Sequence, residues 1–75
     1  MSEKKYAHIT VTPFNEVDGK IVYGVHSNKG DSLLGLIEFY PRWKTYTFAP
    51  EEDAVFDATC LSYIIDFMVN HAGKQ

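Results

Sequence analysis

Alternating apolar and polar residues over the first fifty positions predict a series of β-strands. Four segments rich in β-branched and aromatic residues have this pattern: residues 6–12, 21–26, 34–40 and 44–48. Pro13 is expected to end the first strand, because proline has no backbone N–H to donate within a sheet. Asp18 and Gly19 carry the strongest turn signal. The pattern therefore predicts consecutive antiparallel hairpins, and Gly24 indicates a bulge or a ring packed over the backbone.

The apolar period changes to a helical one after residue 57. Asp57 is the predicted N-cap, with Thr59 as the alternative, and Gly73 suits the position after the last turn. The stripe expected to face the core, at helical spacing, is Leu61, Ile64, Ile65 and Met68, widened by Cys60 and Phe67. The residues expected to point away from the core are Ser62, Asp66 and Asn70.

Together these elements predict an α+β fold in one domain over residues 1–75, with residues 1–5 frayed. The expected order is β-β-β-β-α, an antiparallel sheet of three to four strands with the C-terminal helix packed on one face. Of the 75 residues, 45% are apolar and 15% aromatic, which suffices for one small core. One helix cannot cover both faces of a sheet, so the opposite face is expected to be exposed.

Residues 36–48 form the most informative segment of the chain. Pro41 and Arg42 separate two alternating runs, so a two-residue turn would pair Tyr40 with Trp43. A slightly longer loop is the alternative, because proline at the first turn position favours turns whose twist suits tight hairpins poorly. The face expected to meet the helix carries Ile37, Phe39, Tyr46 and Phe48. The opposite face is expected to carry Leu36, Glu38, Tyr40, Trp43, Thr45 and Thr47.

The outer face of this hairpin holds aromatic and charged side chains that the core does not need. The candidate partner-binding residues are Glu38, Tyr40, Arg42, Trp43 and Lys44. Tyr, Trp and Arg are the side chains most often found at the centre of protein interfaces. We therefore predict a non-enzymatic binding module that engages a protein partner or forms a homo-oligomer. The structural alternative is that Tyr40 and Trp43 brace the turn, with Arg42 stacked on Trp43.

A nucleic-acid-binding module is the second functional hypothesis. Tyr40 and Trp43 would stack on bases, while Arg42, Lys44 and Lys29 would contact phosphates. The formal net charge of −3 disfavours this hypothesis, because nucleic-acid binders usually carry a basic surface that displaces counterions.

Neither catalysis nor a cofactor or metal is predicted from the remaining reactive residues. His8, His26 and His71 are expected on three different elements without ligand spacing. Cys60 opens the helix, where the dipole could lower the pKa of its thiol, but no base or oxyanion site accompanies it. We interpret it as structural. The acidic run at residues 51–53 is interpreted as a solvated loop, with a patch for a basic partner as the alternative.

The sequence also carries signals about location. It has no signal-peptide pattern and no run of 18 apolar residues, and Cys60 is its only cysteine. These features predict a cytoplasmic protein that does not bind a membrane.

Several segments resemble small phage- and prophage-encoded proteins of unknown function. The segments that carry the likeness are Gly30-Asp31, Leu34-Gly35-Leu36-Ile37, Tyr40-Pro41-Arg42-Trp43-Lys44, Tyr46, Phe48-Ala49-Pro50 and the helix at residues 57–68. The resemblance implies a bacterial cytoplasmic or phage-infection setting and no particular activity. A looser topological similarity is to the sheet-plus-helix DNA-binding domains of some integrases and plant transcription factors. Their exposed sheets are basic, whereas Glu38 and several threonines occupy the outward positions here.

Overall fold

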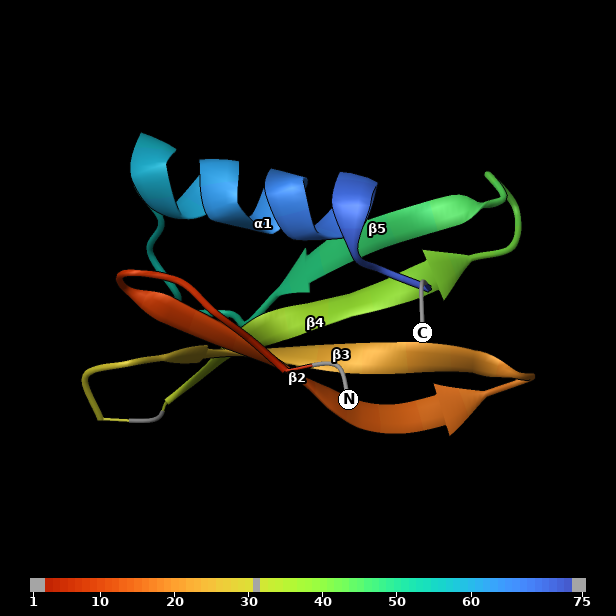
Figure 1. Cartoon of the computed structure of the whole chain (residues 1–75), viewed down its shortest axis with the longest axis horizontal. Helices are drawn as coiled ribbons and strands as arrows, with labels where there is room; N and C mark the ends of the chain where they lie inside the picture. The colour runs from red at the N-terminus through yellow and green to blue at the C-terminus, as the bar shows by residue number, and fades with distance from the viewer. Residues whose placement is uncertain (1–2, 31, 74–75) are drawn as a thin grey trace.

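The computed structural model describes residues 3–30 and 32–73, which form one antiparallel sheet and one helix (Figure 1). The elements are β1 Lys4–Lys5, β2 Ile9–Val17, β3 Lys20–Ser27, β4 Leu33–Tyr40, β5 Thr45–Pro50 and α1 Ala58–Asn70. The strands follow one another in space in chain order, β1-β2-β3-β4-β5. The predicted α+β class and the C-terminal helix are confirmed, but the sheet has five strands instead of three to four.

The additional strand is β1, at a place where the sequence predicted a frayed segment. Lys4 pairs with Val11 and Lys5 pairs with Thr10. Two adjacent lysines carry no alternating apolar pattern, so only the pairing with β2 reveals this strand. Met1 and Ser2, the first two residues of the predicted frayed segment, lie outside the described residues.

β2 continues past Pro13, which the sequence analysis took as its end. Pro13 pairs with Tyr23, and the register shifts between Pro13 and Asn15, so that Phe14 is the extra residue of a bulge. Proline is tolerated at edge strands and at bulges, and this position has both properties, because β1 pairs only with Thr10 and Val11. The predicted turn at Asp18 and Gly19 is confirmed, since both have positive φ (52° and 81°) and join β2 to β3.

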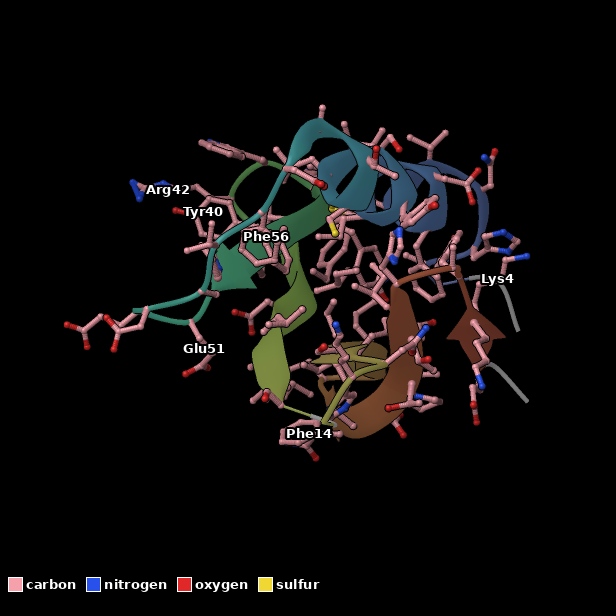
Figure 2. All side chains as sticks on the ribbon, turned by 90° about the vertical axis from the view of Figure 1, so that its left-hand side faces the viewer. Lys4, Phe14, Tyr40, Arg42, Glu51 and Phe56 are labelled. Carbon is pink, nitrogen blue, oxygen red and sulfur yellow. The ribbon has the colours of Figure 1, made fainter. Side chains whose placement is uncertain are left out.

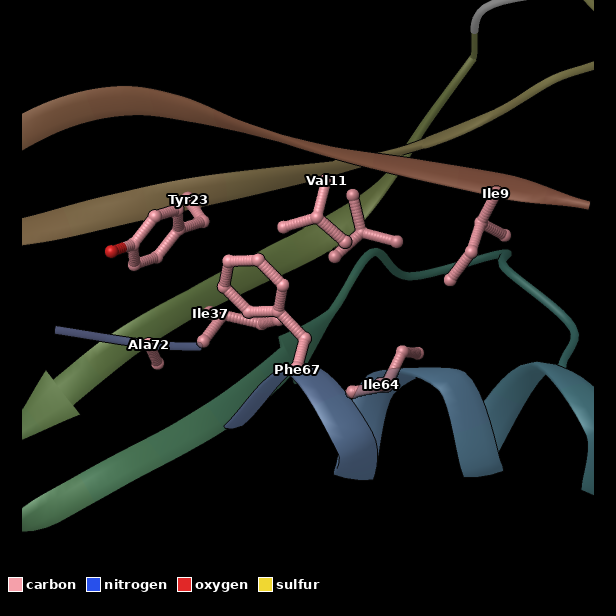
Figure 3. Packing of buried hydrophobic residues seen from close by; sticks show 8 residues of the cluster. Ile9, Val11, Tyr23, Ile37, Ile64, Phe67 and Ala72 are labelled. Carbon is pink, nitrogen blue, oxygen red and sulfur yellow. The ribbon is translucent and has the colours of Figure 1, made fainter. Parts of the chain in front are cut away.

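The sheet is curled around the helix. Figure 2 shows β5 on one side of α1 and β2 on the other, and these two strands are the ones that α1 contacts most. The buried cluster fills the space between sheet and helix (Figure 3). At its centre the Phe67 ring meets the Tyr23 ring edge to face, with centroids 4.7 Å apart. The members of this cluster are Ile9, Val11, Tyr23, Val25, Ile37, Ile64, Phe67 and Ala72.

α1 begins where the sequence predicted and buries only part of the predicted stripe. The Asp57 carboxylate accepts a hydrogen bond from the Cys60 backbone N–H at 2.9 Å, which confirms Asp57 as the N-cap. The buried side chains of the helix are Ile64 and Phe67, with Cys60, Tyr63 and Met68 partly buried. Leu61 and Ile65 were predicted to face the core and are exposed by 42% and 55%. The apolar residues of α1 cover a wider arc than the sheet can bury, and the sheet covers the part of that arc that carries Ile64 and Phe67.

Asp66, expected to point away from the core, instead joins α1 to the segment before β2. Its carboxylate accepts a hydrogen bond from the Tyr6 hydroxyl at 2.7 Å and one from the Asn70 side chain at 2.8 Å. These bonds, that from Tyr6 first, lower the pKa of Asp66. The Tyr6 ring also stacks on Tyr63, with centroids 4.9 Å apart, so the start of the chain is attached to the middle of the helix.

Replacing Tyr6 by phenylalanine is expected to lower the free energy of unfolding by about 1 kcal/mol, because it removes the hydrogen bond and keeps the ring stack. The pKa of Asp66 is depressed in the folded state, so this stabilisation is present above the carboxyl's unfolded pKa, near 4, and is lost as the pH falls through the folded value. Urea unfolding of both proteins at neutral pH and at low pH measures the difference. A difference that stayed constant into the acid range would contradict the role of Asp66.

Candidate interaction surface

The hairpin formed by β4 and β5 has a four-residue loop in place of the predicted two-residue turn. Tyr40 pairs with Thr45 and Ile37 with Phe48, so the register differs by two residues from the predicted one. The backbone N–H groups of Trp43 and Lys44 both donate to the Tyr40 carbonyl, at 3.1 and 2.8 Å. Because side chains alternate with a period of two, a shift by two leaves the paired residues of β4 and β5 on their predicted faces. Trp43 lies in the loop and not on a strand face. Ile37 is buried, and Tyr46 and Phe48 pack against the core cluster, as predicted. Phe39 lies outside that cluster and meets Tyr46 edge to face at 5.6 Å.

We call residues 40–44 the hairpin tip. The Trp43 side chain is 68% exposed, and its ring contacts the edge of the 38% exposed Tyr40 ring, with centroids 5.0 Å apart. The predicted contact between these rings is therefore present, within the loop and not between paired strand residues. Arg42 does not stack on Trp43, and Figure 2 shows it directed away from the body of the protein. Within the described residues, Arg42 and Lys44 have no ion pair.

A hollow of about 140 Å³ lies beside the hairpin tip, between the β2–β3 hairpin and the end of β4. In Figure 1 the β2–β3 turn and the β4–β5 loop project from the same end of the sheet. The hollow is lined by the apolar residues Val17, Val22, Phe39 and Pro41 and by the charged residues Asp18, Lys20 and Glu38. We call it the turn-end hollow. Glu38, one of the predicted site residues, lines this hollow together with Pro41 of the hairpin tip.

The β2–β3 side of this hollow was not predicted from the sequence. Val17 is 53% exposed, and the Lys20 ammonium lies 4.6 Å from the centre of the Phe39 ring. The signal available in the sequence was topological, because alternate turns of an antiparallel meander meet at one end of the sheet. Which side chains line the hollow depends on the bulge at Phe14, which changes the alternation of β2.

A second, polar hollow lies at the β1–β2 edge, on the face of the sheet opposite α1. It has a volume of about 470 Å³ and is lined by Glu3, Lys5, Thr10, Thr12, His26 and Asn28. The Thr10 hydroxyl donates to the Asn28 side-chain oxygen, and the Asn28 amide donates to the Tyr6 carbonyl at 2.9 Å. These bonds use polar groups of the hollow to hold the β3–β4 turn against the start of the chain. We assign them a structural role.

The other reactive residues do not assemble into a site. Among residues 3–30 and 32–73, no three His, Cys, Asp or Glu side chains lie close enough to hold a metal ion. Cys60 is partly buried, and burial raises the pKa of its thiol, with Asp57 acting in the same direction. The net shift is therefore opposite to the one that the helix dipole alone would produce. Glu51, Glu52 and Asp53 are exposed in the turn that follows β5.

Within the part of the chain that the structure describes, no helix has the length and apolar character needed to span a membrane. Comparison of the chain with protein-family models, curated proteins and solved structures gives no match. The resemblance of residues 30–68 to small phage-encoded proteins stays a prediction.

Proposed function

We propose that the protein is a non-enzymatic binding module whose interaction surface is the hairpin tip together with the turn-end hollow. The observation that carries this proposal is the exposure of Trp43 (68%) on a loop that holds it against Tyr40. A large aromatic side chain left in water costs free energy that a partner's surface would recover. On the resemblance to phage-encoded proteins, we propose a cytoplasmic setting.

The hairpin tip has the chemistry of an interface centre. Trp and Arg are the residue types that contribute most to binding when they are buried against a partner. The Tyr40 ring restricts the Trp43 indole from one side, which reduces the side-chain entropy lost on binding. Arg42 and Lys44 are exposed and unpaired within the described residues, so a partner's carboxylates can approach both without breaking an existing ion pair.

The turn-end hollow supports the choice of a protein partner. Its volume of about 140 Å³ is close to that of an apolar cavity that holds benzene. A leucine or phenylalanine side chain of a partner fits this size, and the apolar lining favours its burial. Lys20 together with Asp18 and Glu38 gives the lining both signs of charge, which suits a polypeptide better than a phosphate backbone.

Replacing Arg42 and Trp43 together by alanine is expected to reduce partner binding by about 30-fold or more, the loss typical of an interface centre. Tagged wild type and variant are used to capture proteins from a bacterial lysate, and each identified partner is then titrated as a purified protein. The matched control is Phe14→Ala with Lys5→Ala, which removes an exposed aromatic ring and an exposed cation away from the tip.

Thermal unfolding of both double variants shows whether they remain folded. If the tip variant binds its partner as tightly as the control does, the proposal is wrong. Titration with single-stranded oligonucleotides at low salt tests the nucleic-acid alternative. Binding that weakens steeply with salt and requires Arg42 and Lys44 would replace the protein partner by a nucleic acid. If the tip variant alone has a lower oligomeric mass in solution than the wild type, the partner is a second copy of the chain.

A further inference from the structure

The side of α1 that faces away from the sheet carries an apolar ridge, and Figure 1 shows no described element over that side. Leu61, Ile65 and Val69 are 42%, 55% and 65% exposed. They are spaced four residues apart, so they lie one above another along about two turns of the helix. Ala58 and Ser62 are exposed next to this ridge and are small. We call Leu61, Ile65 and Val69 the helix ridge.

The charges on α1 restrict what can cover the helix ridge. The helix has no lysine or arginine, and its one charged residue is Asp66. The Asp66 carboxylate is already bonded to Tyr6 and Asn70 and lies 3.6 Å from His71. A helix that lies on a membrane surface usually has Lys and Arg beside its apolar face, and a nucleic acid needs cations. A partner with a strongly charged surface would find no opposite charge here to replace the water around its charged groups. An equally neutral surface has no such charged groups to desolvate.

We propose that a second copy of the chain covers the helix ridge, with the two α1 helices antiparallel and Ile65 at the two-fold axis. Leu61 and Val69 are each four residues from Ile65, on opposite sides. A two-fold axis at Ile65 therefore places Leu61 of each copy against Val69 of the other. The same surface serves both copies, as a closed two-fold interface requires. This inference does not depend on the hairpin tip.

Helix geometry favours this arrangement. Ridges formed by residues four apart interdigitate when two helices cross at about −50°, with axes about 8–10 Å apart. The small side chains of Ala58 and Ser62 permit that approach. Antiparallel helices also bring the positive N-terminal end of one helix to the negative C-terminal end of the other, which is the favourable orientation of the two dipoles.

Sedimentation velocity and light scattering from low to high micromolar concentration test the proposal. The wild type is expected to change from monomer to dimer over this range. Ile65→Glu places two like charges at the two-fold axis and is expected to weaken the dimer by about 100-fold or more. The matched control is Thr59→Glu, which adds the same charge to the first turn of the same helix, on an exposed flank away from the ridge. It is expected to leave dimerisation unchanged.

Circular dichroism of each variant shows whether α1 and the fold are retained. A wild type that is monomeric at every concentration overturns the proposal, as does a dimer that survives Ile65→Glu. Loss of the dimer in Arg42→Ala with Trp43→Ala, but not in Ile65→Glu, would assign the interface to the hairpin tip instead. In that case the hairpin tip would bind a second copy of the chain. The two sets of variants thus distinguish the hairpin-tip interface from the helix-ridge dimer.

Disulfide cross-linking tests the direction of the helices, with Cys60→Ala as the background. Ile65→Cys alone is expected to cross-link under mild oxidation, because each copy meets its own equivalent at the axis. Leu61→Cys alone and Val69→Cys alone are not expected to cross-link. An equimolar mixture of these two variants is expected to cross-link. Cross-linking of Leu61→Cys with itself and not with Val69→Cys would contradict the antiparallel pairing.

Discussion

Replacement of Phe67 by alanine is expected to lower the free energy of unfolding by about 3–5 kcal/mol. The Phe67 side chain is 1% exposed and lies between α1 and the sheet, where its ring meets Tyr23 at 4.7 Å (Figure 3). Removing the ring loses its burial and leaves a cavity that the curled sheet cannot easily close. A domain of this size has a total stability of about 4–11 kcal/mol. The substitution is therefore expected to remove between about a quarter and all of that stability.

The control for Phe67→Ala is Val69→Ala, two residues along the same helix. Val69 is 65% exposed, so its truncation is expected to change stability by less than about 0.5 kcal/mol when the protein is dilute. Urea unfolding at low micromolar concentration, followed by circular dichroism, measures both. Similar losses for the two variants would mean that α1 does not face the sheet through Ile64 and Phe67.

Replacement of Gly35 by alanine is expected to lower the free energy of unfolding by about 1–3 kcal/mol, although alanine normally suits a strand better than glycine. A Cβ atom at Gly35 would lie 2.7 Å from the Ala49 carbonyl oxygen and 2.7 Å from an edge carbon of the Phe48 ring. The carbonyl belongs to β5, which pairs with β4 at this position. It cannot move away without disturbing the pairing between the two strands.

Gly24→Ala is the matched control, because Gly24 is also buried within a strand. Its added Cβ would meet the end of the His26 side chain at 3.0 Å and the Phe14 ring at 3.6 Å. A partly exposed side chain can move by a few tenths of an ångström, so the expected change is less than about 0.5 kcal/mol. Urea midpoints of the two variants compare the sites. Equal losses would refute the argument that the β5 backbone makes Gly35 necessary.

The helix cap and the β2–β3 turn depend on neighbouring residues, and the sequence predicted both correctly. The Asp57 carboxylate accepts a hydrogen bond from the backbone N–H of Cys60, three residues further along. Asp18 and Gly19 form the β2–β3 turn. Gly24 is covered by the Phe14 and His26 rings, which is one of the two alternatives predicted for it. The cap and the turn rest on contacts within a few residues, so the local chemistry decides them, whereas the Phe14 ring reaches Gly24 from the neighbouring strand.

The errors lie where distant residues compete. The hairpin has the longer loop that was the alternative to a two-residue turn, yet Ile37 and Phe48 kept their faces because the register moved by two. The core stripe predicted for the helix was too wide. It included Ile64 and Phe67, which are buried, and also Leu61 and Ile65, which are exposed. The tertiary structure buries Ile64 and Phe67 because the concave side of the sheet accepts the face that carries the Phe67 ring. The exposed helix ridge is the direct result of that choice.

By itself the sequence determined the α+β class, the helix start, the two faces of the β4–β5 hairpin and the exposed position of Trp43. These depend on period, caps and turn residues, which are local properties. Only the tertiary structure decided that Lys4 and Lys5 form a strand, that two turns enclose a hollow beside Glu38, and which side of α1 is buried. Each of these depends on how the sheet curls and which distant side chains fill it, and burial against distant partners outweighs local preference in a core this small.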